Sequence, residues 1–174
     1  MRKQTKLVAV LSTAALLAIG ASMTSFAATG WAEEDGTWVY YNRDGERATD
    51  QWKKSGNNWY WLDSNGEMAI DQLIEDGDNY YYVDINGVMA ANQWVAIDNE
   101  DAGQDNEPDH YWYYFQANGK ALKNGDNAKV ALKTINGKKY AFDDEGKMLF
   151  GWVDENSAER LDNTDGDAFK EGDY

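Results

Sequence analysis

Two rows of aromatic residues recur along the middle of this 174-residue chain, and their side chains are the ones best suited to bind a ligand. The upstream row contains Trp31, Trp52 and Trp94, with Leu73 at the third place. The downstream row contains Trp38, Trp59, Tyr80 and Trp112. Aromatic faces attract cations through the ring quadrupole, and they also stack on sugars. These rings either pack between consecutive repeats or meet at the surface as an open cage for a cation or a sugar, and such a cage needs no catalytic group.

The aromatic rows belong to a sequence repeat that ends in glycine. Gly45, Gly66 and Gly87 follow one another at intervals of 21 residues, and Gly119 and Gly146 continue the series across insertions. A downstream-row residue stands seven positions before the first four of these glycines, and Lys139 takes that place before Gly146. Such a period indicates units that bury their apolar faces by stacking on their neighbours.

Turn residues divide each repeat into two strands. Asp35-Gly36 and Asn136-Gly137 stand before the aromatic triplets of the first and fifth repeats, and residues 55–58 and 76–79 take this place in the second and third. Asp, Asn and Gly supply the positive φ angles of tight hairpin turns. Each repeat is thus predicted to be a β-hairpin, which is marginal alone in water. We expect an all-β solenoid of stacked β-hairpins, with helix only at the N-terminus.

The N-terminal residues have the pattern of a secretory signal peptide. Arg2, Lys3 and Lys6 precede an apolar run over residues 7–19, and small residues follow up to Ala27. The run is shorter than the roughly 20 residues that span a membrane. We expect a signal peptide over residues 1–27, a repeat domain of about five hairpins over 28–152, and an acidic loop with an incomplete further repeat over 153–174. We therefore expect a secreted protein without a membrane span.

Charge and composition exclude several classes of function. The formal net charge of −15 disfavours a nucleic-acid partner, which needs clustered Lys and Arg. The acidic insertion between Val95 and Tyr111 does not follow the calcium-loop pattern, since Ala102 occupies a ligand position, so a solvated loop is favoured over a metal site. The chain has no cysteine and only one histidine, His110. We expect no metal, no cofactor and no catalytic site.

The pattern W-x6-W-Y-Y/W-x4-G-x-M resembles the choline-binding or cell-wall-binding repeat of Gram-positive surface proteins. The related glucan-binding repeats of extracellular glucosyltransferases are similar, and the resemblance covers Gly30 to about Trp152. It implies a β-solenoid in which each ligand lies between consecutive hairpins. In the choline-binding branch the cage consists of two tryptophans from one repeat and a tyrosine from the next, often with a methionine.

Carried over to this chain, the resemblance implies three cages. The second, which matches the pattern best, consists of Trp52, Trp59 and Met68, closed by Tyr81 or its neighbour Tyr80. The first consists of Trp31 and Trp38, closed by Tyr60. A third consists of Trp94 and Trp112 with Tyr140. Leu73 in the third repeat, and Leu132 and Lys139 in the fifth, replace cage aromatics, so those repeats are expected to be structural.

The resemblance implies a secreted, non-catalytic module that attaches to the cell wall or cell surface through choline groups of teichoic acids. Binding to glucan or another wall polysaccharide is the alternative, because aromatic faces serve both ligands. Such repeats also form the targeting part of longer wall hydrolases and glucosyltransferases. The residue pattern leaves the choice between choline and sugar open.

Overall fold

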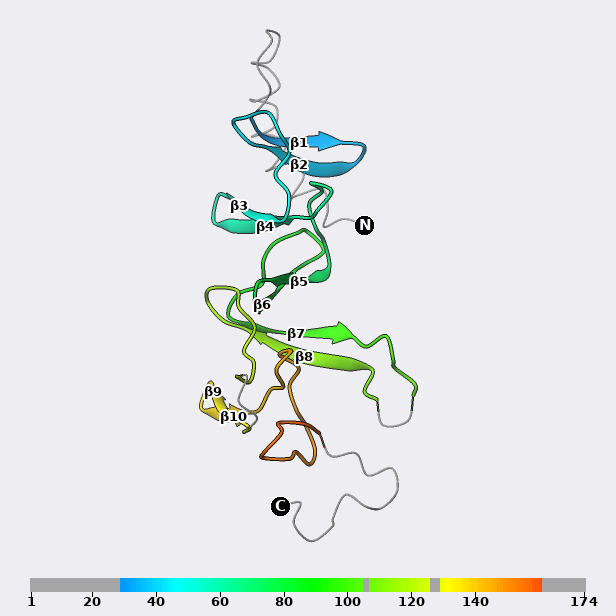
Figure 1. The fold of residues 1–174 in the computed structure, drawn as a ribbon, viewed down its shortest axis with the longest axis vertical. Helices are drawn as coiled ribbons and strands as arrows, with labels where there is room; N and C mark the ends of the chain where they lie inside the picture. Colours follow the sequence, from blue (N-terminus) through cyan, green and yellow to red (C-terminus); the bar gives the residue numbers. More distant parts are fainter. Residues whose placement is uncertain (1–28, 105–106, 126–128, 161–174) are drawn as a thin grey trace. The chain divides into compact units, whose positions relative to one another are not determined.

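A computed structural model describes residues 29–104, 107–125 and 129–160 of this chain. The predicted signal helix and the end of the expected acidic C-terminal segment lie outside these ranges. Within them the chain is all-β, and each strand pairs with its neighbour in sequence to form a two-stranded antiparallel hairpin (Figure 1). The predicted all-β fold of successive hairpins is confirmed.

Five hairpins follow one another through the described part of the chain. Their strands are β1 (Gly30–Glu34) with β2 (Thr37–Tyr41), β3 (Gln51–Ser55) with β4 (Asn58–Leu62), β5 (Gln72–Asp76) with β6 (Asn79–Val83), β7 (Gln93–Asp98) with β8 (His110–Phe115), and β9 (Lys133–Ile135) with β10 (Lys138–Tyr140). The acidic insertion forms the connection between β7 and β8, so it lengthens one hairpin without interrupting the repeat.

The tight turns use the residues that their geometry requires. Asp35 and Gly36 both have positive φ (51° and 79°), as both central residues of a type I′ turn must, and the turn at Asn136 and Gly137 is the same. In the β3–β4 hairpin only the first central residue, Gly56, has positive φ, at 59°. A single positive φ at that position is typical of a type II′ turn.

The segment that follows each hairpin contains the repeat glycine and folds back onto the second strand of that hairpin. We call this segment the glycine tail. In the second repeat Gly66 N donates to Asp63 O over 2.9 Å, and the Asp63 carboxylate accepts from the backbone N–H groups of Asn65 (2.8 Å) and Glu67 (2.9 Å). Ala69 N then donates to Trp61 O over 2.9 Å. The same carboxylate arrangement recurs at Asp84 and Asp143, so the tail has one fixed conformation in these repeats.

Backbone hydrogen bonds dock each tail on the preceding hairpin. The residue two positions after the repeat glycine donates its N–H to the carbonyl of a downstream-row aromatic. These bonds are Met68 to Trp38 (2.8 Å), Met89 to Trp59 (2.9 Å), Ala121 to Tyr80 (2.8 Å) and Met148 to Trp112 (2.7 Å). The downstream row thus has a backbone role, because its carbonyls join one repeat to the next.

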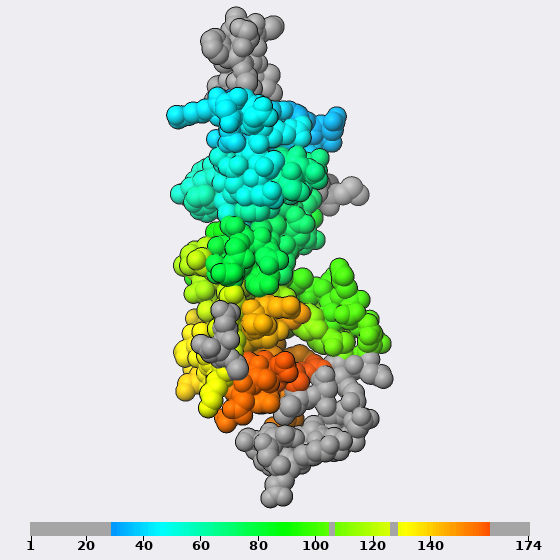
Figure 2. Space-filling model, in the orientation of Figure 1, coloured from blue at the N-terminus to red at the C-terminus, as the bar shows by residue number. Residues whose placement is uncertain are grey.

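The chain forms two compact units, each with its own buried residues. The first contains the described residues up to Ile74 together with 81–90, and the second contains 75–80 together with the described residues from Ala91 onward. In the first unit, one apolar cluster contains Trp31, Trp38, Ala48, Tyr60 and Leu62, and another contains Trp61, Ala69, Ile74 and Val83. Figure 2 shows the blue and cyan atoms of the first two repeats in one continuous surface. In the second unit the buried side chains include Tyr113, Phe115, Ala121, Ile135 and Phe142.

Candidate ligand-binding site

Each upstream tryptophan lies across its own hairpin from an aromatic residue of the second strand. The paired residues are Trp31 with Tyr40, Trp52 with Trp61, and Trp94 with Tyr114. Their ring centroids are 5.4, 5.2 and 5.2 Å apart, with interplanar angles of 84°, 61° and 64°. Residues directly opposite in an antiparallel pair have neighbouring Cβ atoms, so hairpin pairing alone brings these rings into edge-to-face contact.

A tyrosine of the following repeat adds a third ring to each pair. Tyr60 lies 5.5 Å from Trp31, Tyr81 lies 5.1 Å from Trp52, and Tyr140 lies 4.8 Å from Trp94, all measured between ring centroids. We call the resulting groups the first trio (Trp31, Tyr40, Tyr60), the second trio (Trp52, Trp61, Tyr81) and the third trio (Trp94, Tyr114, Tyr140). Each trio joins two consecutive repeats, as the family resemblance implies for the tryptophan and the next-repeat tyrosine.

The second wall differs from the one expected from sequence. The residues opposite Trp38, Trp59 and Trp112 are Glu33, Lys54 and Ala96, two residue pairs nearer the hairpin turn than the upstream tryptophans and their partners. Trp59 and Trp112 are 40% and 46% exposed, while Trp38 is buried in the first apolar cluster. Strand register is the physical reason, because the residue opposite Trp52 is Trp61 and not Trp59. The rings that lie opposite the upstream tryptophans, Tyr40, Trp61 and Tyr114, were not among the residues expected from sequence.

Two further expected residues take different places. Met68 packs against the cluster of Trp31, Trp38 and Tyr60, one repeat earlier than the cage to which the pattern assigns it. Tyr80, the alternative to Tyr81, contributes its carbonyl to the docking bond with Ala121. The ring that lies beside Trp52 from the following repeat is Tyr81.

The three trios differ in how far their rings reach the surface. In the first trio Trp31 and Tyr60 are only 5% and 1% exposed, and Tyr40 alone is half-buried. In the second trio Trp61 is buried, and the other two rings are half-buried. All three rings of the third trio are half-buried, and Phe142 stacks behind Trp94 at 5.9 Å and 22°. Access to the rings thus increases from the first trio to the third.

The walls of the trios consist of aromatic rings, and the tyrosine that closes the first trio keeps its proton. Burial raises the pKa of Tyr60, and the nearby Asp84 carboxylate adds to that rise, while a hydrogen bond with Asn58 opposes it. Its phenol therefore stays neutral, and the ring presents its electron-rich face without a competing anion. Such a wall is suited to a cation that carries no N–H donor, because the cation needs no acceptor in return.

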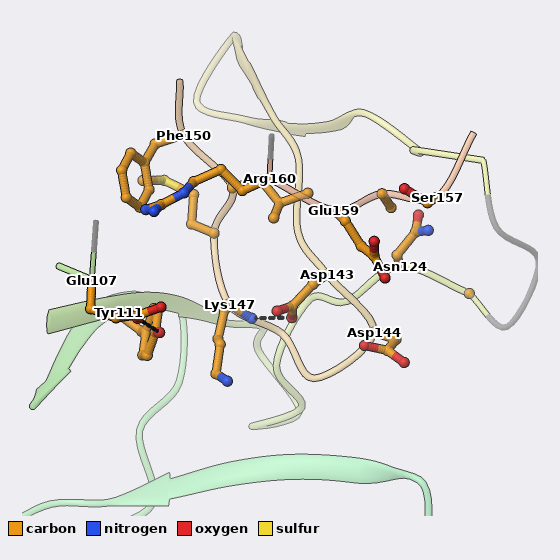
Figure 3. A pocket seen from close by; sticks show the side chains of 14 residues that line it. Glu107, Tyr111, Asn124, Asp143, Asp144, Lys147, Phe150, Ser157, Glu159 and Arg160 are labelled. Atoms are coloured by element: carbon orange, nitrogen blue, oxygen red, sulfur yellow. Dashed lines mark hydrogen bonds between the residues drawn. The ribbon is translucent and has the colours of Figure 1, made fainter. Parts of the chain in front are cut away.

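The second unit also contains a hollow of a different chemical kind (Figure 3). Its volume is about 450 Å³, and no trio residue lines it. Lys147 lies 4.7 Å from the ring centroid of Tyr111, and the Arg160 guanidinium lies 4.6 Å from that of Phe150. Burial raises the pKa of Asp143, whose carboxylate accepts backbone N–H bonds from Lys147 and Glu145. The cations in this hollow already face rings, so it offers no open aromatic wall like those of the trios.

The acidic β7–β8 loop is organised by its own hydrogen bonds. Asn99 Nδ2 donates to Glu107 Oε2 (3.1 Å) and to Pro108 O (2.9 Å), and the Tyr111 hydroxyl donates to Glu107 Oε2 over 2.5 Å. Among the residues that the structure describes, no group of three or more His, Cys, Asp or Glu could hold a metal ion. Over the same ranges, no helix has the length and apolar character needed to cross a membrane.

Comparison with known families agrees with the repeat pattern. The family described as "Choline-binding repeat" matches residues 28–72 and 49–94, and the one described as "Putative cell wall binding repeat" matches residues 111–121. These segments contain all of the first trio, all of the second trio and Trp94 and Tyr114 of the third. No curated protein sequence matches the chain significantly.

Similar solved structures include two choline-binding proteins and an alternansucrase. The choline-binding domain of Spr1274 from Streptococcus pneumoniae is 32% identical, with 58% of this chain and 98% of that domain covered, at a TM-score of 0.41. Choline-binding protein F from the same species is 29% identical, with 71% of this chain and 34% of that protein covered, at a TM-score of 0.45. Truncated alternansucrase from Leuconostoc mesenteroides is 22% identical, with 70% of this chain and 10% of that protein covered, at a TM-score of 0.50.

This chain thus spans about a third of choline-binding protein F and a tenth of the truncated alternansucrase. The last of these likenesses shows the fold alone. The repeat profiles, with a hairpin and its docking bond recurring through the described residues, identify the type of module: one that binds cell-wall components or carbohydrate and is non-catalytic in itself. The chain belongs to the choline-binding repeat family and is a wall-associated or cell-surface protein.

Proposed function

We propose that the aromatic trios bind choline-type quaternary ammonium groups of wall teichoic acids, and that the chain is secreted and attaches to the cell wall in this way. The observation that carries the proposal is the recurrence of one arrangement at three places. Each arrangement is centred on a tryptophan. The ring centroids of its cross-strand aromatic partner and of a tyrosine from the next repeat lie 4.8–5.5 Å from the tryptophan ring centroid. Three repetitions from one register favour a shared function.

The chemistry of such a site follows from its aromatic walls. A quaternary ammonium cannot donate a hydrogen bond, so its recognition depends on ring faces and apolar contact, each ring contributing about 0.5–2 kcal/mol. The net charge of −15 adds a long-range attraction for cations and discourages adhesion to polyanions. Each trio alone would bind weakly. Several trios on one chain, meeting a polymer that carries many choline groups, would bind strongly through effective concentration.

The test compares choline with glucan on the same protein. Millimolar free choline should elute the chain, lacking residues 1–27, from a quaternary-amine matrix and should shift its tryptophan emission. Dextran should do neither. Retention on dextran together with no response to choline would overturn the choline assignment and support the carbohydrate one.

Carbohydrate binding is the second candidate function, and the exposed rings of Trp59 and Trp112 favour it. Both rings lie at the surface and outside the trios. An exposed indole face can stack on a sugar ring, and polar neighbours such as Lys54, which lies 5.8 Å from the Trp59 ring centroid, can add hydrogen bonds. In this case the chain would read a glucan or wall polysaccharide. It could also be the targeting part of a longer wall hydrolase or glucosyltransferase.

A further inference from the structure

One lysine of the second repeat places its ammonium group against a ring of the first trio. Lys53 Nζ lies 4.7 Å from the ring centroid of Tyr40, which is within cation–π distance. Lys53 stands opposite Tyr60 on the β3–β4 hairpin, so it lies on the same strand face as the ring that closes the first trio. Its side chain therefore reaches back to the preceding repeat.

The same position holds an apolar residue at the second trio. Counting one repeat of 21 residues from Lys53 leads to Ile74. Ile74 is buried in the cluster that contains Trp61, against which Trp52 and Tyr81 pack. The second trio thus has a hydrocarbon where the first has a cation, although the two repeats otherwise share their ring positions.

The surroundings of Tyr40 strengthen the contrast. A hollow of about 500 Å³ opens beside this ring, and both Lys53 and Arg43 line it. Two cations that line one hollow repel a third cation. Tyr40 is also the one ring of the first trio that is not buried. A quaternary ammonium approaching the first trio must therefore replace an ammonium that is already tethered there.

The third trio shows that a lysine at this position does not always face a ring. Lys133 stands opposite Tyr140, as Lys53 stands opposite Tyr60. Within the described residues, the cation–π contacts include none from Lys133. The distinguishing feature of the first trio is therefore the contact of Lys53 with Tyr40, and not the presence of a lysine in the repeat.

We propose that Lys53 is an internal competitor for the first trio: its ammonium occupies the ring face that a choline group would use and makes this the weakest of the three sites. The inference rests on the proposed choline-binding function and adds a specificity-determining residue to it. Binding at the second and third trios then accounts for most of the affinity for choline.

The test is a choline titration followed at single tryptophans by fluorine NMR of protein labelled with 5-fluorotryptophan. The Trp31 signal reports the first trio and the Trp52 signal reports the second, each assigned by a Trp→Phe variant. Lys53→Met keeps the aliphatic stem and removes the charge. It should tighten choline binding at Trp31 by about 2- to 30-fold, which is the range of one cation–π contact, and leave the Trp52 titration unchanged.

Two further variants separate competition from general electrostatics. Lys54→Met removes the neighbouring charge, whose ammonium faces Trp59, and should change the Trp31 titration less than twofold. Lys53→Arg keeps a cation at the ring and should behave like the unmodified protein. Ile74 shows that the next hairpin accepts an apolar residue at the equivalent position. Circular dichroism would confirm that the variants fold.

Each result decides between the alternatives. If Trp52 titrates with choline while Trp31 responds identically in the Lys53→Met variant and in the unmodified protein, the competitor role is overturned and the choline-binding proposal stands. The competitor role is overturned equally if Lys54→Met tightens binding at Trp31 as much as Lys53→Met does. If no tryptophan signal titrates, the proposed function fails, and the competitor role fails with it.

Discussion

Trp61 lies directly across the β3–β4 hairpin from Trp52, with ring centroids 5.2 Å apart and an angle of 61° between the ring planes. Tyr81 of the following repeat lies 5.1 Å from the same tryptophan. This relationship defines the second trio, and it separates Trp61, a wall of the proposed site, from Trp59, whose carbonyl joins the next repeat and whose ring lies at the surface.

Substitution should therefore weaken choline binding at Trp61 but not at Trp59. Trp61→Leu keeps an apolar side chain but removes an aromatic wall, so choline affinity at the second trio should fall by about 2- to 30-fold. Trp59→Leu should change it less than twofold, because the backbone carbonyl is kept. Isothermal titration calorimetry with choline measures both. A larger loss from Trp59→Leu would return the cage wall to the residue expected from sequence.

Phe142 should be a core residue of the second unit. Its side chain is only 1% exposed and stacks on Trp94. Truncation to alanine leaves a cavity, so Phe142→Ala should lower the free energy of unfolding by about 3–5 kcal/mol. Phe150→Ala is the matched control, since Phe150 is an exposed ring, and should cost less than about 1 kcal/mol. Urea denaturation followed by circular dichroism gives both values, and equal costs would contradict the burial assignment.

Gly87 should tolerate substitution by alanine less well than Gly36, which has nearly the same φ angle. Gly87 and Gly36 have φ of 77° and 79°, so alanine is strained at both. A Cβ atom at Gly87 would lie 2.9 Å from Met68 Cε and 3.1 Å from Ala69 O, whereas one at Gly36 would meet nothing within 4 Å. Gly87→Ala should therefore cost about 1–3 kcal/mol more than Gly36→Ala. Equal melting temperatures would show that the repeats are not packed this closely.

Tyr113 should make the fold sensitive to alkaline pH. Burial raises its pKa to about 12, against about 10 in an unfolded chain. The folded protein holds this proton where the unfolded chain has lost it, so the contribution to stability is complete below pH 10 and is lost as the pH rises toward 12. Unfolding free energies between pH 9 and pH 11 should fall less steeply in Tyr113→Phe. Identical slopes would place Tyr113 in a solvated environment.

The hairpins and much of the site could be predicted because their signals are local. The turn at Asp35-Gly36 has two residues with positive φ, and counting outward from it pairs Trp31 with Tyr40. The next-repeat tyrosines were expected from the family resemblance. The pairing was therefore accessible in principle for the first hairpin, although residue type pointed to Trp38.

The remaining features lack such a signal. Residues 55–58 allow several two-residue turns, and only the structure centres the turn on Gly56 and Asn57, which places Trp61 opposite Trp52. The long β7–β8 insertion leaves no turn from which to count toward Tyr114. Docking bonds use backbone carbonyls that every residue has, so nothing in the sequence separates a downstream-row tryptophan that joins repeats from one that binds a ligand.

The central claim is that the trios hold quaternary ammonium groups, and the most direct test is a crystal structure with arsenocholine, whose arsenic atom gives an anomalous signal. We predict anomalous peaks within about 6 Å of the ring centroids of the second and third trios, with the strongest enclosed by either Trp52, Trp61 and Tyr81 or Trp94, Tyr114 and Tyr140. Peaks confined to the exposed faces of Trp59 and Trp112, or none at millimolar ligand, would contradict it.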